Sequence, residues 1–311
     1  MPNSKLPDFL VVGAAKSGTT SLFHILRNDP GCFIPNIKEG RFFSDMPQYS
    51  KGGEAARWMN ERPRNLETYL KLYAQKSGCI KGDISNDYLY YSEKSIGRIK
   101  EYYSLLGQVE PKILIVLRDP VARVVSMYLH TMRLGSDHKT FREAFDLSAT
   151  RIEEGYSWQF DLKGFGLCSA DVKRFQENFS AVKVFLFDDV FSSSSLVELA
   201  HFLGLDEQLI KRDVARKNVG QAVEPRNKAL FEKSMGLARK IKKTLGVPAN
   251  ESGQDVLWGV PKKIFRMIQR VNEKPIASEI SREDLQYVKS YFADDVGELE
   301  KILGVSLQRW R

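Results

Sequence analysis

The feature that most constrains this chain is a short apolar run that ends in a glycine- and hydroxyl-rich turn. Residues 9–12 read Phe-Leu-Val-Val, and residues 13–21 read Gly-Ala-Ala-Lys-Ser-Gly-Thr-Thr-Ser. The apolar run predicts a buried parallel strand, and the periodicity of 20–27 predicts a helix after the turn. Small residues at a helix start let backbone N–H groups converge on an anion, which the helix dipole also attracts. We therefore predict a phosphate-binding loop whose cation is Lys16.

Apolar runs and helical segments alternate along the rest of the chain. Further strands are predicted where apolar runs stop at polar or turn residues, at 79–83, 112–117 and 182–187. Further helices are predicted where apolar residues recur at helical spacing, at 120–134, 172–179, 193–203 and 281–303. This alternation predicts an α/β fold with a central parallel β-sheet flanked by helices. No repeat or long linker divides the sequence, so we expect a single domain over residues 1–311.

Composition limits which cellular compartment and which kind of ligand we expect for this chain. The apolar share of 42% is enough for a sizeable core. The longest apolar runs, 9–15 and 113–117, fall far short of the roughly 20 residues that a membrane span needs, and no segment has a signal-peptide pattern. Cys32, Cys79 and Cys168 form no CxxC pair, which argues against a disulfide framework or a zinc site. We expect a cytoplasmic protein without a metal, and the net charge of +8 suits an anionic ligand.

A second anion site is predicted where the strand 112–117 ends. Arg118 follows that strand directly, and Arg123 and Ser126 lie on the helix that begins at Pro120. Ligands of open α/β sheets bind at the carboxyl ends of the strands, and a guanidinium with a nearby hydroxyl can hold a phosphate. The alternative is an ordinary ion pair between Arg118 and a neighbouring aspartate. Together the two sites indicate a nucleoside with phosphates at both ends.

The first loop differs from the nucleotide-triphosphate loop, in which a lysine follows the last glycine. Here Thr19 follows Gly18, and Lys16 lies inside the loop. A phosphate-loop kinase or NTPase that uses Asp119 to hold Mg²⁺ remains an alternative. A non-catalytic basic module that binds polyanions is another alternative, although the sequence lacks the aromatic interleaving expected of a single-strand binder.

These motifs resemble those of the sulfotransferases that use 3′-phosphoadenosine 5′-phosphosulfate (PAPS). Residues 7–22 are similar to the family's 5′-phosphosulfate loop, and residues 117–128 are similar to its 3′-phosphate motif. Residues 38–43, Lys-Glu-Gly-Arg-Phe-Phe, resemble the Lys-Glu-x-x-Phe-Phe segment of the heparan-sulfate-type and bacterial branch, whose glutamate is the catalytic base. Residues 82–89 resemble the branch's Gly-Glu-x-Ser-x-x-Tyr-Leu segment near the acceptor. The resemblance extends to 202–205 and 307–310 and so spans nearly the whole chain.

The resemblance implies roles for individual residues. Glu39 would take the proton from an acceptor hydroxyl, Lys16 would bind the oxygen that bridges phosphate and sulfuryl group, and Lys38 would steady the sulfuryl oxygens. The PAPS-binding set would be Lys16, Ser17, Gly18, Thr19, Thr20, Ser21, Arg118 and Ser126, with Lys217 and Asn218 from the loop 216–220. For Glu39, the alternative is an ordinary surface glutamate beside Lys38 and Arg41.

The acceptor side would be formed by Arg41, Phe43, Asp83, Ser85 and His130. The sequence departs from the family here, because members often have His where Arg41 stands, Glu where Asp83 and Asp188 stand, and Tyr near Cys168. We expect the first departure to change acceptor preference. The other departures leave the cofactor site intact.

Several remaining residues are alternatives for catalysis or binding. Related cytosolic enzymes use a histidine base, so His130 is the first alternative to Glu39, ahead of His24, His138 and His201. The aromatic pairs 90–91 and 102–103 are interpreted as core and surface residues rather than adenine platforms. The basic region 226–274 is predicted to be helical, with a surface loop at 246–253, and to form a possible cap on the acceptor side.

The acceptor is the least determined part of the prediction. The bacterial type of sequence favours a hydroxyl of a small natural product, or a β-hydroxyacyl group tethered to an acyl carrier protein as in polyketide assembly lines. A carbohydrate or an amine-bearing metabolite is the alternative. We expect neither nucleic acid nor a membrane as a partner.

Overall fold

A five-stranded parallel sheet forms the centre of the computed structural model, which describes residues 5–36, 39–74, 78–137, 139–207, 223–244, 267, 271–275 and 280–311. Its strands stand in the order β2-β3-β1-β4-β5, and every neighbouring pair is parallel. Their bounds are β1 (Phe9–Gly13), β2 (Cys32–Phe33), β3 (Ile80–Ile84), β4 (Lys112–Leu117) and β5 (Val182–Leu186). The order places β1, which carries the predicted phosphate loop, between β3 and β4.

Strands β1 and β4 are buried on both faces of the sheet, which explains why their sequences are apolar throughout. Alternate residues of a strand point to opposite faces. Accordingly Leu10 and Ile113 belong to one hydrophobic cluster, and Val11 and Leu114 belong to the other. The sheet therefore has a core on each side, as the predicted α/β layers require.

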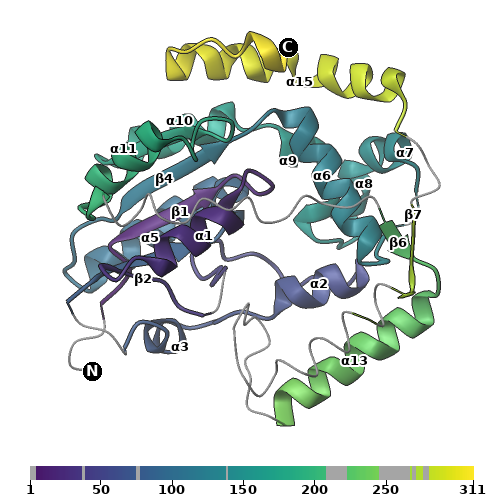
Figure 1. Cartoon of the computed structure of the whole chain (residues 1–311), viewed down its shortest axis with the longest axis horizontal. Coiled ribbons are helices and arrows are strands. Elements are labelled where there is room, and N and C mark those ends of the chain that lie inside the picture. The colour runs from purple at the N-terminus through teal and green to yellow at the C-terminus, as the bar shows by residue number, and fades with distance from the viewer. Residues whose placement is uncertain are drawn as a thin grey trace.

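Helices cover both faces of this sheet (Figure 1). Helices α1 (Thr19–Asn28) and α11 (Ser193–Leu203) pack on the face of Val11. The other face is covered by α5 (Ser92–Leu105), α6 (Pro120–Arg133), α10 (Ser169–Asn178) and α15 (Arg282–Leu303). None of the described helices is long and apolar enough to cross a membrane.

Shorter elements complete the described part of the chain. They are α2 (Gly53–Asn60), α3 (Leu66–Lys71), α4 (Asp87–Tyr90), α7 (Phe141–Asp146), α8 (Ser148–Glu153), α9 (Leu162–Gly166), and the 3₁₀ helices η1 (Trp158–Phe160) and η2 (Gln308–Trp310). Helix α13 (Lys228–Thr244) lies at the edge of the molecule, away from the large sheet (Figure 1). Strands β6 (Val223–Pro225) and β7 (Glu273–Pro275) form a separate antiparallel pair.

The predicted fold class is confirmed, and all four predicted strands are present. The expectation that the basic region 226–274 is helical is wrong at its end, because β7 begins at Glu273 and pairs with β6. Both strands are three residues long and end in proline, a residue that rarely occurs inside a sheet, so neither carried a strand signal. The predicted loop 246–253 lies outside the described residues.

Candidate functional site

The loop between β1 and α1 has the features of an anion-binding site. Helix α1 follows Gly18, whose φ of +83° lies in the left-handed region, and no described side chain caps the first N–H groups of the helix. A Cβ at Gly18 would lie 2.8 Å from the Phe187 ring, so the position requires glycine. The helix therefore begins without an N-cap side chain at its positive dipole end, where an anion is favoured.

The hydroxyl side chains of the loop add further donors. Ser17 is fully buried, and its Oγ has no hydrogen-bond partner among the residues that the structure describes. Thr19 and Ser21 are also buried, and Thr20 is half-buried. Buried polar atoms are nearly always hydrogen-bonded in native proteins, so the unpartnered Ser17 hydroxyl indicates that a ligand completes this loop.

The two predicted anion motifs lie side by side. The Arg118 guanidinium, at the end of β4, donates from Nη1 to the Lys16 carbonyl oxygen at 3.1 Å. It lies 4.6 Å from the centre of the Phe187 ring, which also contacts Gly18. Ser126 is half-buried on α6, the helix that follows Arg118. The arginine thus holds the backbone of the loop at the residue that carries its lysine.

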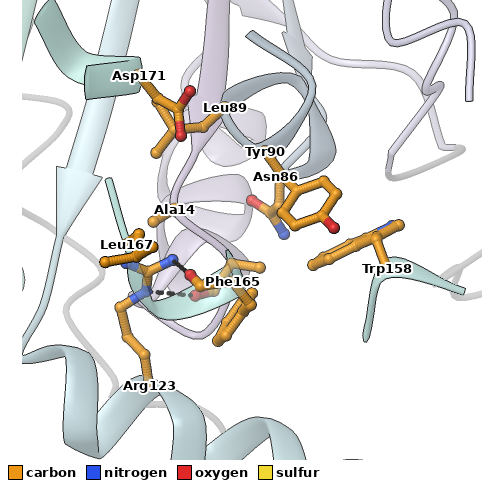
Figure 2. Close-up of a pocket in the computed structure, with 10 residues that line it drawn as sticks. Ala14, Asn86, Leu89, Tyr90, Arg123, Trp158, Phe165, Leu167 and Asp171 are labelled. Atoms are coloured by element: carbon orange, nitrogen blue, oxygen red, sulfur yellow. Dashed lines mark hydrogen bonds between the residues drawn. The ribbon is translucent and has the colours of Figure 1, made fainter. Parts of the chain in front are cut away.

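A second arginine supports the same loop from the protein interior (Figure 2). Arg123 of α6 is buried, and it donates from Nε to the Ala15 carbonyl oxygen at 3.3 Å and from Nη2 to the Phe165 carbonyl oxygen at 2.8 Å. Burial lowers the pKa of Arg123, and the nearby thiol of Cys168 opposes that change. Arg123 therefore joins α6, α9 and the loop.

Glu39 is held at the same edge of the sheet by main-chain contacts. Its N–H donates to the Ile84 carbonyl oxygen at 3.1 Å, at the end of β3, and Ile84 is in register with Val11 of β1. The link to the loop runs through Asn86, which donates to the Glu39 carboxylate and lines one pocket together with Ala14 and Ala15. The backbone of Glu39 has a φ of +65°, a strained conformation for a residue with a side chain.

The Glu39 carboxylate is buried and engaged on both oxygens. Oε1 accepts a hydrogen bond from Asn86 Nδ2 at 2.8 Å, and Oε2 forms an ion pair with Arg41. Only 7% of Glu39 is exposed, so the alternative of an ordinary surface glutamate is wrong. Each carboxylate oxygen can accept a second hydrogen bond, so an acceptor hydroxyl could still bind there.

The structure brings the predicted acceptor-side residues together but buries four of them. Phe43 is fully buried among aromatic rings, with the Tyr69 ring 5.3 Å away. Asp83 accepts hydrogen bonds of 2.7 Å from the hydroxyls of Tyr69, Tyr88 and Ser85. Burial raises the pKa of Asp83, and these three donors oppose the rise. The hydroxyl donors take the place of solvent around this carboxylate, which suits a structural support.

Arg41 and Ser85 belong to the same support. The Arg41 N–H donates to Ser85 Oγ at 3.0 Å, and the Arg41 guanidinium donates to the Trp58 carbonyl oxygen at 3.0 Å. The guanidinium also lies 4.5 Å from the centre of the Trp58 ring. Only 1% of Arg41 is exposed.

The histidine candidates are spread over the molecule. His130 is half-buried on α6, where its Nδ1 lies 3.3 Å from Arg133 Nη2 and its ring makes an edge contact with Trp58. His24 packs edge-on against Phe23, and His201 is exposed. Lys38, His138, Lys217 and Asn218 lie outside the described residues.

Sequence reasoning missed Asn86 and Asp87, which follow β3. Asn86 holds Glu39, and Asp87 is buried with neither carboxylate oxygen in a well-formed hydrogen bond to a described residue. Burial raises the pKa of Asp87 to about 6, while Arg41 and the Ser44 hydroxyl oppose the rise. Both residues fall within the segment 82–89 that resembled the family. Their polar character within a buried segment was the only available signal.

A small pocket lies between the loop residues Ala14 and Ala15 and the side chain of Asn86 (Figure 2). It is lined by Ala14, Ala15, Asn86, Leu89, Tyr90, Arg123, Trp158, Phe165, Leu167 and Asp171. The Tyr90 hydroxyl on its wall donates to Asp161 at 2.7 Å. In the described ranges, no three His, Cys, Asp or Glu side chains gather closely enough to hold a metal ion.

The chain is similar to known sulfotransferases in sequence and in fold. The sequence profile described as the sulfotransferase domain matches residues 6–218. Two curated relatives are a bifunctional heparan sulfate N-deacetylase/N-sulfotransferase 4 of Mus musculus, 28% identical over 127 residues, and a bifunctional heparan sulfate N-deacetylase/N-sulfotransferase 3 of Homo sapiens, 24% identical over 128 residues. Each match covers 40% of this chain and only 13% of the relative.

A solved structure is similar over the whole length. The crystal structure of a sulfotransferase from Alicyclobacillus acidocaldarius matches with a TM-score of 0.69 and 25% sequence identity. The match covers 99% of each chain.

Proposed function

The chain is a member of the sulfotransferase family, and from that premise we propose that it transfers a sulfuryl group from PAPS to a hydroxyl acceptor. One observation carries the proposal: the buried Ser17 hydroxyl has no partner within the described chain and stands at an uncapped helix start. Lys16 and Arg118 flank it. Donors of this kind, with two cations beside them, suit a nucleotide that carries a phosphosulfate and a second phosphate.

The residues present fit PAPS at both of its charged ends. Ser17 to Ser21 and the first N–H groups of α1 would hold the 5′-phosphate, and Lys16 would reach the bridging oxygen. Arg118 and Ser126 would hold the 3′-phosphate. Lys217 and Asn218, which lie outside the described residues, are proposed to assist them.

When bound, PAPS supplies the sulfuryl group and the phosphate that leaves. The Lys16 ammonium would stabilise the negative charge that develops on the leaving oxygen. Glu39 would accept the proton of the acceptor hydroxyl as the oxygen–sulfur bond forms. Lys38 is proposed to neutralise the sulfuryl oxygens. Asn86 and the Ile84 carbonyl oxygen hold Glu39 in place for this step.

Glu39→Gln tests the general base. Removing a positioned base typically lowers kcat by about 10²–10⁴-fold, whereas donor binding does not involve the carboxylate. We expect that loss with an unchanged Kd for 3′-phosphoadenosine 5′-phosphate (PAP), measured by calorimetry. Glu101→Gln, at an exposed position of α5, is the control and should retain full activity. Activity of Glu39→Gln within a few-fold of wild type would exclude this role and favour His130.

A thermal-shift comparison separates this proposal from the kinase alternative. PAP without Mg²⁺ is expected to raise Tm by several degrees, because binding to the folded state alone stabilises it. ATP with Mg²⁺ is expected to change Tm little. The opposite pattern would support a phosphate-loop kinase.

We propose a small natural-product hydroxyl as the acceptor, or a β-hydroxyacyl group on an acyl carrier protein. An amine acceptor is the second candidate, because both curated relatives are named as N-sulfotransferases. Mass spectrometry with PAPS and a panel of carrier-bound hydroxyacyl, sugar, phenol and amine acceptors tests both. The product should gain the mass of one sulfuryl group. A gain restricted to the amine would overturn the first choice.

We also propose a cytoplasmic location. Cys79 and Cys168 form no disulfide among the described residues, and Cys168 is buried in the core, as is common in a reducing compartment. Fractionation of the native cell would test this.

A further inference from the structure

A buried carboxylate lies behind the main-chain segment that carries the proposed base. Asp83 of β3 is only 3% exposed. Its carboxylate accepts hydrogen bonds of 2.7 Å from the hydroxyls of Tyr69, Ser85 and Tyr88, and we call these four residues the Asp83 network. A buried carboxylate is costly unless hydrogen bonds replace its water. Apolar side chains could fill the same space without that cost, so packing alone does not account for the network.

Two of these hydroxyls also accept hydrogen bonds from the main chain just after the proposed base. The Arg41 N–H donates to Ser85 Oγ at 3.0 Å, and the Phe42 N–H donates to Tyr88 Oη at 3.1 Å. Each hydroxyl uses its single proton on Asp83, which leaves its lone pairs for these N–H groups. The carboxylate therefore orients both hydroxyls toward the main chain.

The main chain that they hold is strained. Glu39 has a φ of +65° and Arg41 has a φ of +51°, in the left-handed region that residues with a side chain rarely adopt. Such conformations persist only where the surrounding structure holds them. The Glu39 N–H donates to the Ile84 carbonyl oxygen, and the bonds to Ser85 and Tyr88 hold the residues that follow. These three bonds supply the support that the turn requires.

The segment also packs directly against the network. A Cβ at Gly40 would lie 3.3 Å from the Tyr69 ring and 3.7 Å from an Asp83 carboxylate oxygen. The Phe42 ring stacks on the Tyr69 ring, with 4.5 Å between the ring centres. A change in the network is therefore transmitted to the segment at short range.

We infer that Asp83, Ser85 and Tyr88 are positioning residues, which fix the main-chain turn that presents Glu39 to the acceptor. The inference rests on the proposed role of Glu39 as the base. Asp83 orients the two hydroxyls, and the hydroxyls hold the two N–H groups that follow the base. The three residues act on the reaction through this turn and do not contact the acceptor.

Two conservative tyrosine variants provide the test. Tyr69 and Tyr88 are both fully buried and donate to the same Asp83 oxygen at 2.7 Å, but the Phe42 N–H donates to Tyr88. Tyr88→Phe removes the acceptor of that N–H. Tyr69→Phe, the matched control, removes the same bond to Asp83 and keeps the stacked ring. Hydrogen exchange of the Phe42 amide, measured by NMR on the free protein, should become about 10-fold faster in Tyr88→Phe and change little in Tyr69→Phe.

The other two positions are tested in the same way. Ser85→Ala removes the acceptor of the Arg41 N–H and should speed exchange of that amide about 10-fold. Ser95→Ala is its control, because Ser95 is also fully buried and its Oγ has no hydrogen-bond partner among the described residues. Asp83→Asn replaces an acceptor by an NH2 donor, so it should speed exchange at both amides.

Turnover supplies a second measurement, which a merely structural role would not separate from donor binding. A displaced base should lower kcat by about 10–100-fold in Tyr88→Phe and Ser85→Ala. The Kd for PAP should stay unchanged in both variants, because neither side chain belongs to the proposed donor site. Tyr69→Phe should keep kcat within a few-fold of wild type.

Exchange of the Phe42 amide that is unchanged in Tyr88→Phe, or that rises equally in Tyr69→Phe, would overturn the inference. Should Tyr88→Phe fail to fold, Ser85→Ala and the Arg41 amide decide the question. Faster exchange with a wild-type kcat would also overturn it, provided that Glu39→Gln is inactive. Full activity of Glu39→Gln would instead contradict the proposed role of the base and leave the held turn intact.

Discussion

At the scale of single residues, the loop between β1 and α1 contains a buried polar atom that has no hydrogen-bond partner among the described residues. The buried Ser17 Oγ lacks a partner in the described structure, although Thr19 and Ser21 lie close to it in the loop. A buried hydroxyl without a hydrogen bond lowers the stability of the free protein. We expect the same hydroxyl to add to affinity when it donates a hydrogen bond to an oxygen of the proposed ligand. The Ser17 hydroxyl would therefore lower the stability of the free protein and raise its affinity for the proposed ligand.

Ser17→Ala should separate these two effects. We expect the free energy of unfolding of the free protein to stay constant or to rise by up to about 1 kcal/mol, because an unsatisfied group is removed. We expect the Kd for PAP to rise by about 10–100-fold, which corresponds to the ~1.5–3 kcal/mol of one hydrogen bond to a charged group. Urea denaturation and calorimetry measure the two quantities. Ser180→Ala, at an exposed position, should change neither. A less stable protein with unchanged PAP affinity would contradict this account of Ser17.

At the scale of elements, α15 supports a helix that is distant in sequence. Asp295 of α15 accepts hydrogen bonds from the N–H groups of Cys168 at 3.0 Å and Ser169 at 3.1 Å, where α10 begins. The Cys168 side chain makes no capping bond of its own. The C-terminal helix therefore supplies the N-cap of α10.

Asp295→Ala should lower the free energy of unfolding by about 1–2 kcal/mol, as the loss of an N-cap does. Asp294→Ala changes the exposed neighbour of the same helix and should have little effect. Chemical denaturation of the two variants provides the comparison. Equal stability of the two would exclude a capping role for Asp295.

The elements also show which parts of the fold could be predicted from the sequence. Strands β1 and β4 were predictable because they are buried on both faces and are therefore apolar throughout. Strand β2 has two residues and no such signal. Helix α5 was missed because its sequence is largely polar with Gly97 at its middle, so packing of Ile96, Ile99 and Tyr103 stabilises it rather than local propensity.

The candidate site likewise contains residues that the sequence suggested and residues that it did not. Lys16 and Glu39 could be proposed from the sequence because each belongs to a local motif; their roles come from the resemblance and stay predictions. Asn86 could not be proposed, because it acts through a contact between distant segments; Asn86 and Glu39 are 47 residues apart. The predicted acceptor contacts of Arg41 and Asp83 assumed exposure, which only the packed structure could test.

At the scale of the whole molecule, buried carboxyl groups link stability to pH. Burial raises the pKa values of Asp87 and Asp171 to about 6, well above the usual range of an aspartate. Between about pH 4 and 6 the folded state therefore binds more protons than the unfolded state. These two groups favour folding when protonated, and that contribution is lost as pH rises through about 6.

The double variant Asp87→Asn, Asp171→Asn should remove this dependence. We expect it to match wild type near pH 4 and to be more stable at pH 7, by on the order of 2 kcal/mol for each group. Urea denaturation of both proteins from pH 4 to pH 7 measures the difference. A difference that does not change with pH would contradict the assignment.

The pairing of β1 with β3 also bears on how such a protein could acquire new acceptors. The loop that begins after Gly13 and the Ile84 carbonyl oxygen that holds Glu39 belong to adjacent strands, which lie about 4.8 Å apart in any sheet. If Glu39 and the loop act as proposed, their relative placement is set by this sheet. Insertions among the peripheral helices could exchange one alcohol for another during evolution without rebuilding the chemistry.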